Sequence, residues 1–201
     1  MVAEEATKVS EAEAAVPRLL RRYREEIVPA MLERFGYPSR LAVPQLEKIV
    51  VNMGIGRAVG ERRRIELAVA ELAQITGQRP VVTRARHAVS GFKLRKGDPV
   101  GCRVTLRGRR MYEFLDRLLS VALPRVRDFR GLSETAFDEA GNYTLGLAEQ
   151  GVFPEVNLDA MEFAQGMNVT LIVGRSSPEE SRELLRLFGV PFRRAEEAQG
   201  Q

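Results

Sequence analysis

The sequence predicts an α+β fold, with a mainly antiparallel or mixed sheet, helices packed on one face and the other face open. Segments with apolar residues at every third or fourth position, typical of amphipathic helices, are interspersed with segments in which apolar and polar residues alternate. The hydrophobic share of the 201 residues is 44%, which is enough for a core. The polar halves of the alternating segments leave one side of the sheet without apolar groups to bury.

Four segments have helical periodicity. The first covers about residues 17–35, and the second has its apolar stripe at 65–75. The third has its stripe at 111–119, directly after a strand-like segment. The last begins at Ser177, which forms a predicted capping box with Glu180, and a proline occupies the first helical position.

Five segments are strand candidates. In the clearest one, apolar Cys102, Val104 and Leu106 alternate with polar or basic side chains, which predicts one buried and one open face. Continued alternation in another segment places Val82, Arg84 and Arg86 on one side. The five candidates are 48–53, 80–86, 101–107, 142–150 and 167–174.

The chain fits a single folded domain. We expect an acidic, flexible extension over residues 1–16, one domain over 17–194 and a flexible tail over 195–201. The first residues lack the features of a signal peptide, and no stretch has the roughly 20 apolar residues that a membrane helix needs. A single cysteine, Cys102, excludes an internal disulfide. These features predict a cytoplasmic protein without a membrane partner.

Charge is strongly segregated along the chain. Residues 79–130 contain 14 Arg or Lys and 4 Asp or Glu, whereas the rest of the chain is acidic on balance. A concentrated basic segment repels itself unless an anionic partner lies on it, and nucleic acid is the commonest such partner. A solvated surface with arginines spread over several faces is the alternative.

A glycine-rich turn, Gly54-Ile55-Gly56 with Gly60 further on, lies between a predicted strand and a predicted helix. Its spacing does not match a dinucleotide-binding turn, and no P-loop sequence follows. We interpret it as a tight loop that needs positive φ, with an RNA-phosphate contact as the alternative. His87 is the only histidine, so no His-based triad or metal site can form. No cofactor, metal or enzymatic activity is predicted.

Two aromatic residues interleave with the basic ones. Phe92 stands in a segment broken by Gly91 and Gly97, which predicts a long exposed loop or a wide hairpin tip. Phe129 lies in a short irregular basic segment, where exposure and burial are equally compatible with the sequence. Either ring could stack on a base.

Several segments resemble one family. KIVVNMGIG, ITGQRPVVTRAR, TLRGRRMYEFLDRL, LPRVRDFRG and GNYTLG are similar to segments of the bacterial large-ribosomal-subunit protein five, the family that binds 5S rRNA. The resemblance runs from about residue 17 to 194. It implies a non-catalytic protein of the central protuberance, with 5S rRNA bound on the open sheet face.

The resemblance also implies site residues and partners. Asn52, Gln78, Thr83 and Thr105 match hydrogen-bonding positions for rRNA. Arg84, Arg103 and Arg107 are added from strand alternation, as phosphate contacts. The family segment that contacts peptidyl-site tRNA corresponds to a loop with Arg86, His87, Phe92, Lys93, Arg95 and Lys96. Further implied partners are 23S rRNA, neighbouring large-subunit proteins and a small-subunit head protein.

The chain departs from the family pattern at three places. His87 and Glu139-Ala140 stand where basic residues or Gly-Arg are usual, and the acidic start is longer. Family roles are therefore not transferred to the loop at Glu139-Ala140 or to the extension. A non-ribosomal RNA-binding regulator and, further off, a nucleotide-dependent enzyme are the alternative functions.

Overall fold

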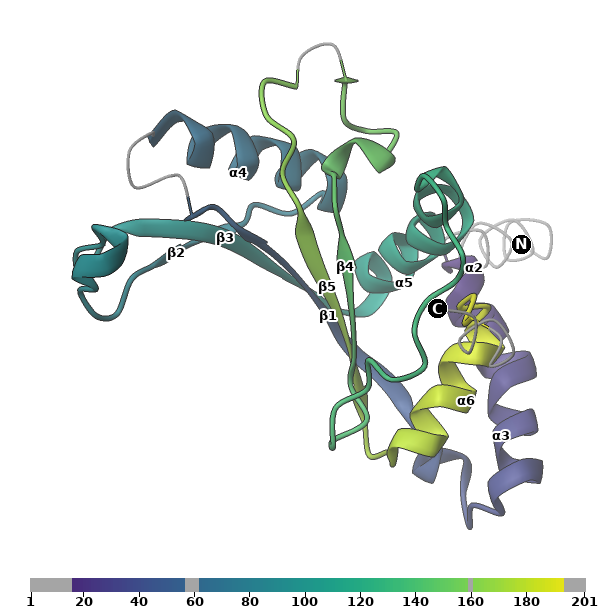
Figure 1. Cartoon of the computed structure of the whole chain (residues 1–201). Coiled ribbons are helices and arrows are strands. Elements are labelled where there is room, and N and C mark those ends of the chain that lie inside the picture. Colours follow the sequence, from purple (N-terminus) through teal and green to yellow (C-terminus); the bar gives the residue numbers. More distant parts are fainter. Residues whose placement is uncertain (1–15, 57–61, 159–160, 194–201) are drawn as a thin grey trace, which may run out of the picture.

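A computed structural model of the chain describes residues 16–56, 62–158 and 161–193. It confirms the α+β fold. Five antiparallel strands form one sheet in the order β2-β3-β1-β5-β4, so the longest strand lies at the centre (Figure 1). The strands are β1 Gln45–Gly54, β2 Val81–Arg84, β3 Pro99–Leu106, β4 Tyr143–Leu147 and β5 Met167–Gly174. The predicted tail, and all of the predicted extension except residue 16, lie outside the described residues.

The helices follow the predicted stripes. The first is α2 Arg18–Arg22, which continues through a π-helical turn, Tyr23–Ile27, into α3 Val28–Phe35. The others are α4 Arg62–Thr76, α5 Gly108–Arg117 with a π-helical turn at Leu118–Ala122 and a 3₁₀ turn at Leu123–Arg125, and α6 Pro178–Phe188. Neither π turn was predicted. The capping box at the start of α6 is confirmed, because Ser177 and Glu180 exchange both hydrogen bonds.

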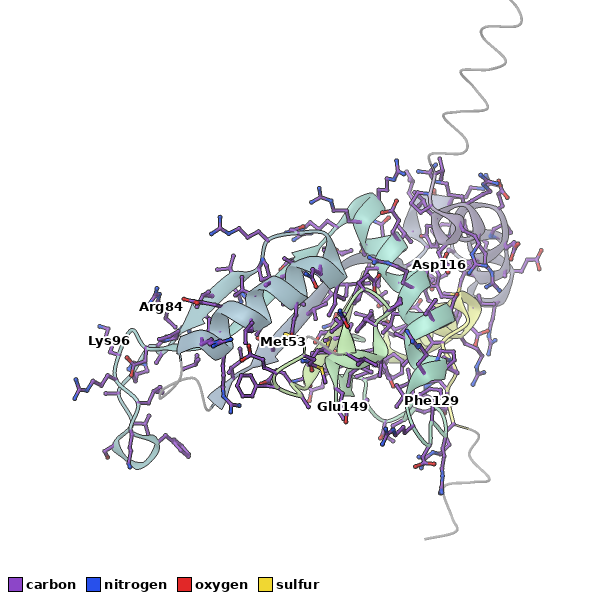
Figure 2. All side chains as sticks on the ribbon, turned by 90° about the horizontal axis from the view of Figure 1, so that it is seen from above. Met53, Arg84, Lys96, Asp116, Phe129 and Glu149 are labelled. Carbon is purple, nitrogen blue, oxygen red and sulfur yellow. The ribbon has the colours of Figure 1, made fainter. Side chains whose placement is uncertain are left out.

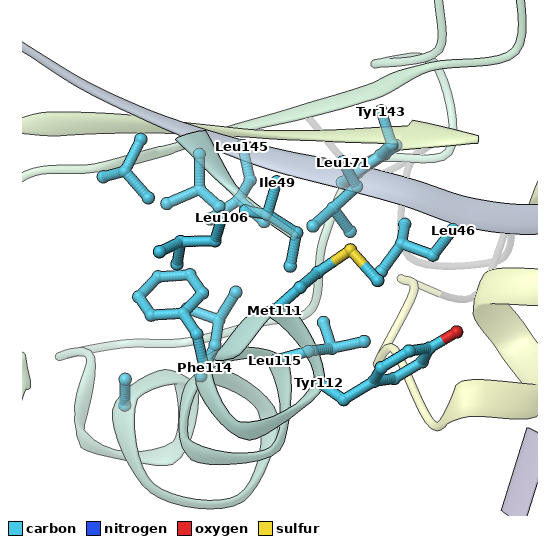
Figure 3. Close-up of a cluster of buried hydrophobic side chains, with 14 of the residues drawn as sticks. Leu46, Ile49, Leu106, Met111, Tyr112, Phe114, Leu115, Tyr143, Leu145 and Leu171 are labelled. Atoms are coloured by element: carbon cyan, nitrogen blue, oxygen red, sulfur yellow. The ribbon is translucent and has the colours of Figure 1, made fainter. Parts of the chain in front are cut away.

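One face of the sheet forms the core with the helices. Ile49 of β1 and Leu106 of β3 have no exposed surface, and they lie over Phe114 and Leu115 of α5 (Figure 3). Full burial of a side chain of this size contributes about 1.5–3 kcal/mol. Further buried residues on this face are Val51, Met53, Cys102, Val104, Leu145, Val169 and Leu171. The alternation in the sequence therefore predicted the buried face correctly.

The opposite face of the sheet is not covered by α4 or α5, which lie on the core side (Figure 1). None of its side chains falls in the buried class except that of Gly101, which is hydrogen alone. We call this surface the open face. Its members are Lys48, Val50 and Asn52 of β1, Val81 and Thr83 of β2, Gly101, Arg103 and Thr105 of β3, Thr144 and Gly146 of β4, and Asn168, Thr170 and Ile172 of β5.

Gly101 allows two backbones to approach closely at this face. A Cβ on Gly101 would lie 2.4 Å from the Met53 carbonyl oxygen and 3.4 Å from the Gly54 Cα. Any side chain would thus separate β1 from β3 at this point, since real contacts of a Cβ with another heavy atom are longer.

The glycine-rich turn differs from its prediction. Gly54 and Gly56 both have ordinary backbone conformations rather than positive φ. Gly54 is still paired with Gly101, and the Ile55 amide donates to the Val100 carbonyl at 2.8 Å, so β1 pairing continues into the turn. Gly60 lies outside the described residues. The glycines therefore serve strand pairing here, and the positive-φ interpretation is wrong for the two that are described.

Candidate nucleic-acid interface

Strand register brings three of the predicted rRNA-binding residues together on the open face. Asn52 of β1 stands opposite Arg103 of β3, and Thr105 stands opposite Val50 in the next row. Directly opposed residues on one face have Cβ atoms about 4.5–5.5 Å apart. Arg103 is exposed, while Asn52 and Thr105 are half-buried. One guanidinium group therefore lies beside a small cluster of neutral hydrogen-bonding groups.

Gln78 and Thr83 are held at the β2 side of this cluster. The Gln78 amide nitrogen donates to the Thr105 carbonyl at 3.3 Å, just after Gly77 ends α4 with φ of 64°. Thr83 stands opposite Gly101 on the open face. In the free protein, Gln78 thus ties the entry of β2 to β3, a role that strand alternation did not predict.

Arg84 is placed differently from the alternation argument, whereas Arg107 is compatible with it. The β2–β3 register shifts between Thr83 and Arg84, and the Arg84 guanidinium donates to the Gly97 carbonyl at 3.0 Å. The expectation that Val82, Arg84 and Arg86 share one side is wrong, because β2 ends at Arg84 and its last pair is irregular. Arg107 follows β3 in extended conformation, with φ of −138° and ψ of 161°, and immediately precedes α5.

The tRNA-loop candidates lie on the connection between β2 and β3. A 3₁₀ turn, Ser90–Phe92, forms its tip, and a single bridge joins Val89 to Leu94. Phe92 is 79% exposed, which confirms the predicted exposed loop. The cations and potential cations of the loop are also exposed: Arg86, His87, Lys93, Arg95 and Lys96.

The basic segment does not form one continuous surface. Arg84 and Lys96 lie at one end of the molecule, whereas Phe129 lies at the other (Figure 2). Phe129 is half-buried against the core, and Arg125, Arg127 and Arg130 beside it are exposed. Among the residues of the open face, only Lys48 and Arg103 carry charge. The open face therefore carries only one of the three arginines that alternation predicted as phosphate contacts, because Arg84 lies at an irregular pair and Arg107 follows the end of β3.

No catalytic arrangement was found in the described ranges. They contain no group of three or more His, Cys, Asp or Glu side chains that could hold a metal. Cys102 is fully buried, and burial, with the nearby Glu71 carboxylate, raises the pKa of its thiol to about 11. A buried thiol of high pKa is a poor nucleophile at neutral pH. Of the helices that are described, none is long and apolar enough to cross a membrane.

An α+β domain with a polar, uncovered sheet face and a separate exposed basic loop is typical of RNA-binding proteins. Two family models match the chain: "Ribosomal protein L5" matches residues 39–95, and the model of the C-terminus of the same ribosomal family matches residues 99–192. The chain belongs to the ribosomal protein L5 family. As a member, it is a protein of the large ribosomal subunit, located with the ribosome in the cytoplasm, and not an enzyme.

Three relatives are similar in sequence to this chain over nearly their whole length, and each is called "Large ribosomal subunit protein uL5". The relative from Rubrobacter xylanophilus is 57% identical, covering 88% of this chain and 98% of the relative. That from Rhodopirellula baltica is 53% identical, covering 90% and 93%. That from Carboxydothermus hydrogenoformans is 51% identical, covering 89% and 100%.

Proposed function

We propose that this chain binds 5S rRNA in the central protuberance of the large subunit through its open face. The observation that carries the proposal is the register of β1 and β3, which lines up Asn52, Arg103 and Thr105 on a surface that neither α4 nor α5 covers. Arg103 supplies charge for a phosphate, and the neutral groups supply orientation. Thr83 extends the same surface to β2.

We further propose that the β2–β3 loop contacts peptidyl-site tRNA. Its exposed Phe92 can stack on a base, and its surrounding cations can neutralise phosphates. The loop lies at the opposite end of the molecule from Phe129, so a tRNA on the loop and a partner near Phe129 would not compete (Figure 2). Contacts with 23S rRNA, neighbouring subunit proteins and a small-subunit head protein complete the proposed set of partners.

Hydroxyl-radical footprinting of 5S rRNA, with and without the purified chain, tests the main proposal. We expect one protected region on 5S rRNA, lost in the double variant Asn52→Ala, Arg103→Ala. Several phosphate contacts also predict a roughly tenfold or greater loss of affinity between low and physiological salt. Protection that survives the double variant, or binding without salt dependence, would contradict the proposal.

A further inference from the structure

The two central rows of the open face continue across β5 to β4, beyond the residues assigned above. Asn168 of β5 stands opposite Asn52, and Gly146 of β4 stands opposite Asn168. In the next row, Thr170 stands opposite Val50, and Thr144 stands opposite Thr170. We call the outer half of these rows the β4–β5 ledge: Thr144, Gly146, Asn168 and Thr170.

The ledge offers free hydrogen-bonding groups to solvent. Asn168 is exposed and, within the described residues, its side-chain amide has no hydrogen-bond partner. The same holds for the amide of Asn52 beside it. The Thr144 and Thr170 hydroxyl oxygens lie 3.1 Å apart and share one hydrogen bond, which leaves further acceptor and donor capacity on the pair.

The ledge carries no charge of its own. Asn168 is separated from Arg103 by β1, and two strand spacings amount to about 9–10 Å. That is about one Debye length at physiological ionic strength, so the field of Arg103 is largely screened at the ledge. The ledge therefore adds no charge for neutralising a phosphate, and its neutral hydrogen-bonding groups suit neutral polar partners.

The ledge is also flat. Gly146 has no side chain, and its neighbours on the ledge are short. The deep, narrow major groove of A-form RNA excludes such a surface, whereas the shallow minor groove displays 2′-hydroxyls that can meet it. Hydroxyl and amide groups can both donate to and accept from a 2′-hydroxyl.

We propose that the β4–β5 ledge binds ribose 2′-hydroxyl groups in the minor groove of an RNA stem, next to the RNA strand whose phosphate contacts Arg103. The ledge would thus supply the preference for RNA sugars, while the β3 side supplies affinity by charge. This inference rests on the proposed function, because it takes 5S rRNA as the RNA on the open face.

The test uses the full chain and the 5S rRNA stem that footprinting protects, synthesised with ribose or with 2′-fluoro sugars at the protected positions. The 2′-fluoro sugar keeps A-form geometry but cannot donate a hydrogen bond. The double variant Asn168→Ala, Thr170→Val should bind the ribose stem about three- to tenfold more weakly than the unchanged chain, a loss of one or two neutral hydrogen bonds. On the 2′-fluoro stem, the two proteins should bind nearly equally, and the salt slope should be unchanged.

Two further variants control for folding and position. Gly146→Ala adds a methyl group that would lie 3.5 Å from the Asn168 side-chain oxygen, an ordinary contact, so the variant should fold normally yet bind the ribose stem more weakly. Gln74→Ala removes an exposed side chain from α4, on the other side of the sheet, and should bind both stems like the unchanged chain.

The outcomes separate this inference from the proposed function. If the unchanged chain protects 5S rRNA but the ledge variants bind both stems as it does, the ledge inference is wrong and the proposed function stands. Equal losses on the ribose and 2′-fluoro stems would overturn the assignment to 2′-hydroxyls. If the unchanged chain shows no preference for 5S rRNA over an unrelated RNA, both the proposed function and this inference fail.

Discussion

The open face and the β2–β3 loop are two polar surfaces built in opposite ways. Residues of the open face are held by strand pairing, on both sides in β1, β3 and β5, and include few charges. The loop has one bridge of its own, and Lys93 and Gly97 adopt positive φ of 52° and 93°. The loop also carries a dense group of exposed cations and potential cations, Arg86, His87, Lys93, Arg95 and Lys96. The open face thus has fixed geometry, which suits orienting a bound RNA, whereas the loop has strong charge, which suits attracting phosphates in more than one arrangement.

The largest contrast should be in thiol reactivity between the sheet and the loop. Cys102 is buried beneath the open face with a pKa raised to about 11, so it reacts only through opening of the sheet. A cysteine at Phe92 would be exposed from the start. In a Phe92→Cys variant at pH 8, we expect the loop thiol to react with a disulfide reagent at least about a hundredfold faster than Cys102. Similar rates for the two thiols would show that the sheet around Cys102 opens readily, so the sheet would not be more rigid than the loop.

A matched pair of glycine substitutions tests how tightly each surface is packed. Gly101→Ala would set a methyl group against the Met53 carbonyl and should destabilise the fold by about 2–3 kcal/mol. Gly91→Ala in the loop meets nothing within 4 Å and has no positive φ, so its effect should stay within about 0.5 kcal/mol. Urea denaturation of both variants measures the difference. Comparable losses in the two would refute the proposed contrast in packing.

Two substitutions on the open face separate charge from orientation. Arg103→Ala should lower 5S rRNA affinity and reduce the slope of log affinity against log salt by about one unit. Asn52→Ala should lower affinity by a similar or smaller factor, with the slope nearly unchanged, because it removes no charge. Filter binding over a range of salt concentrations gives both quantities. An equal reduction in slope for both variants would mean that the division of roles is wrong.

The smallest effect on stability is expected at the loop tip. Phe92 is 79% exposed, so its ring makes little packing contact with the rest of the fold. Phe92→Ala should therefore change the free energy of unfolding by less than about 0.5 kcal/mol. The same variant should weaken tRNA binding to reconstituted ribosomes if the ring stacks on a base. A clear loss of stability would show that the ring belongs to the fold rather than to a partner.

The sequence predicted the elements of the fold well because their signals are local. Alternation in β3 placed Cys102 in the core and Arg103 on the open face, and the Ser177–Glu180 capping box marked the start of α6. Where one residue's position depends on a partner strand, prediction was weaker. The irregular pairing at Arg84 comes from the β2–β3 register, which the sequence of β2 alone does not contain.

The candidate site was predicted in part for the same reason. Asn52, Arg103 and Thr105 fall together because simple alternation holds along β1 and β3. The continuation of their rows to Asn168 and Thr144 requires the strand order, which places β5 beside β1 and β4 beside β5. The alternation in β5 was visible in the sequence, but its neighbour was not. Charge density along the chain, in contrast, overestimated the charge of the open face, because loops and helix ends carry most of the arginines.

A short-range photo-crosslinker on the open face tests the central claim most directly. Val81 stands opposite Arg103 and is 65% exposed, so a benzophenone side chain there should leave the fold intact. In assembled large subunits, we predict that position 81 cross-links to 5S rRNA, whereas the same group at position 92 does not. Cross-links from position 81 only to other RNA or to proteins, with none to 5S rRNA, would contradict the account.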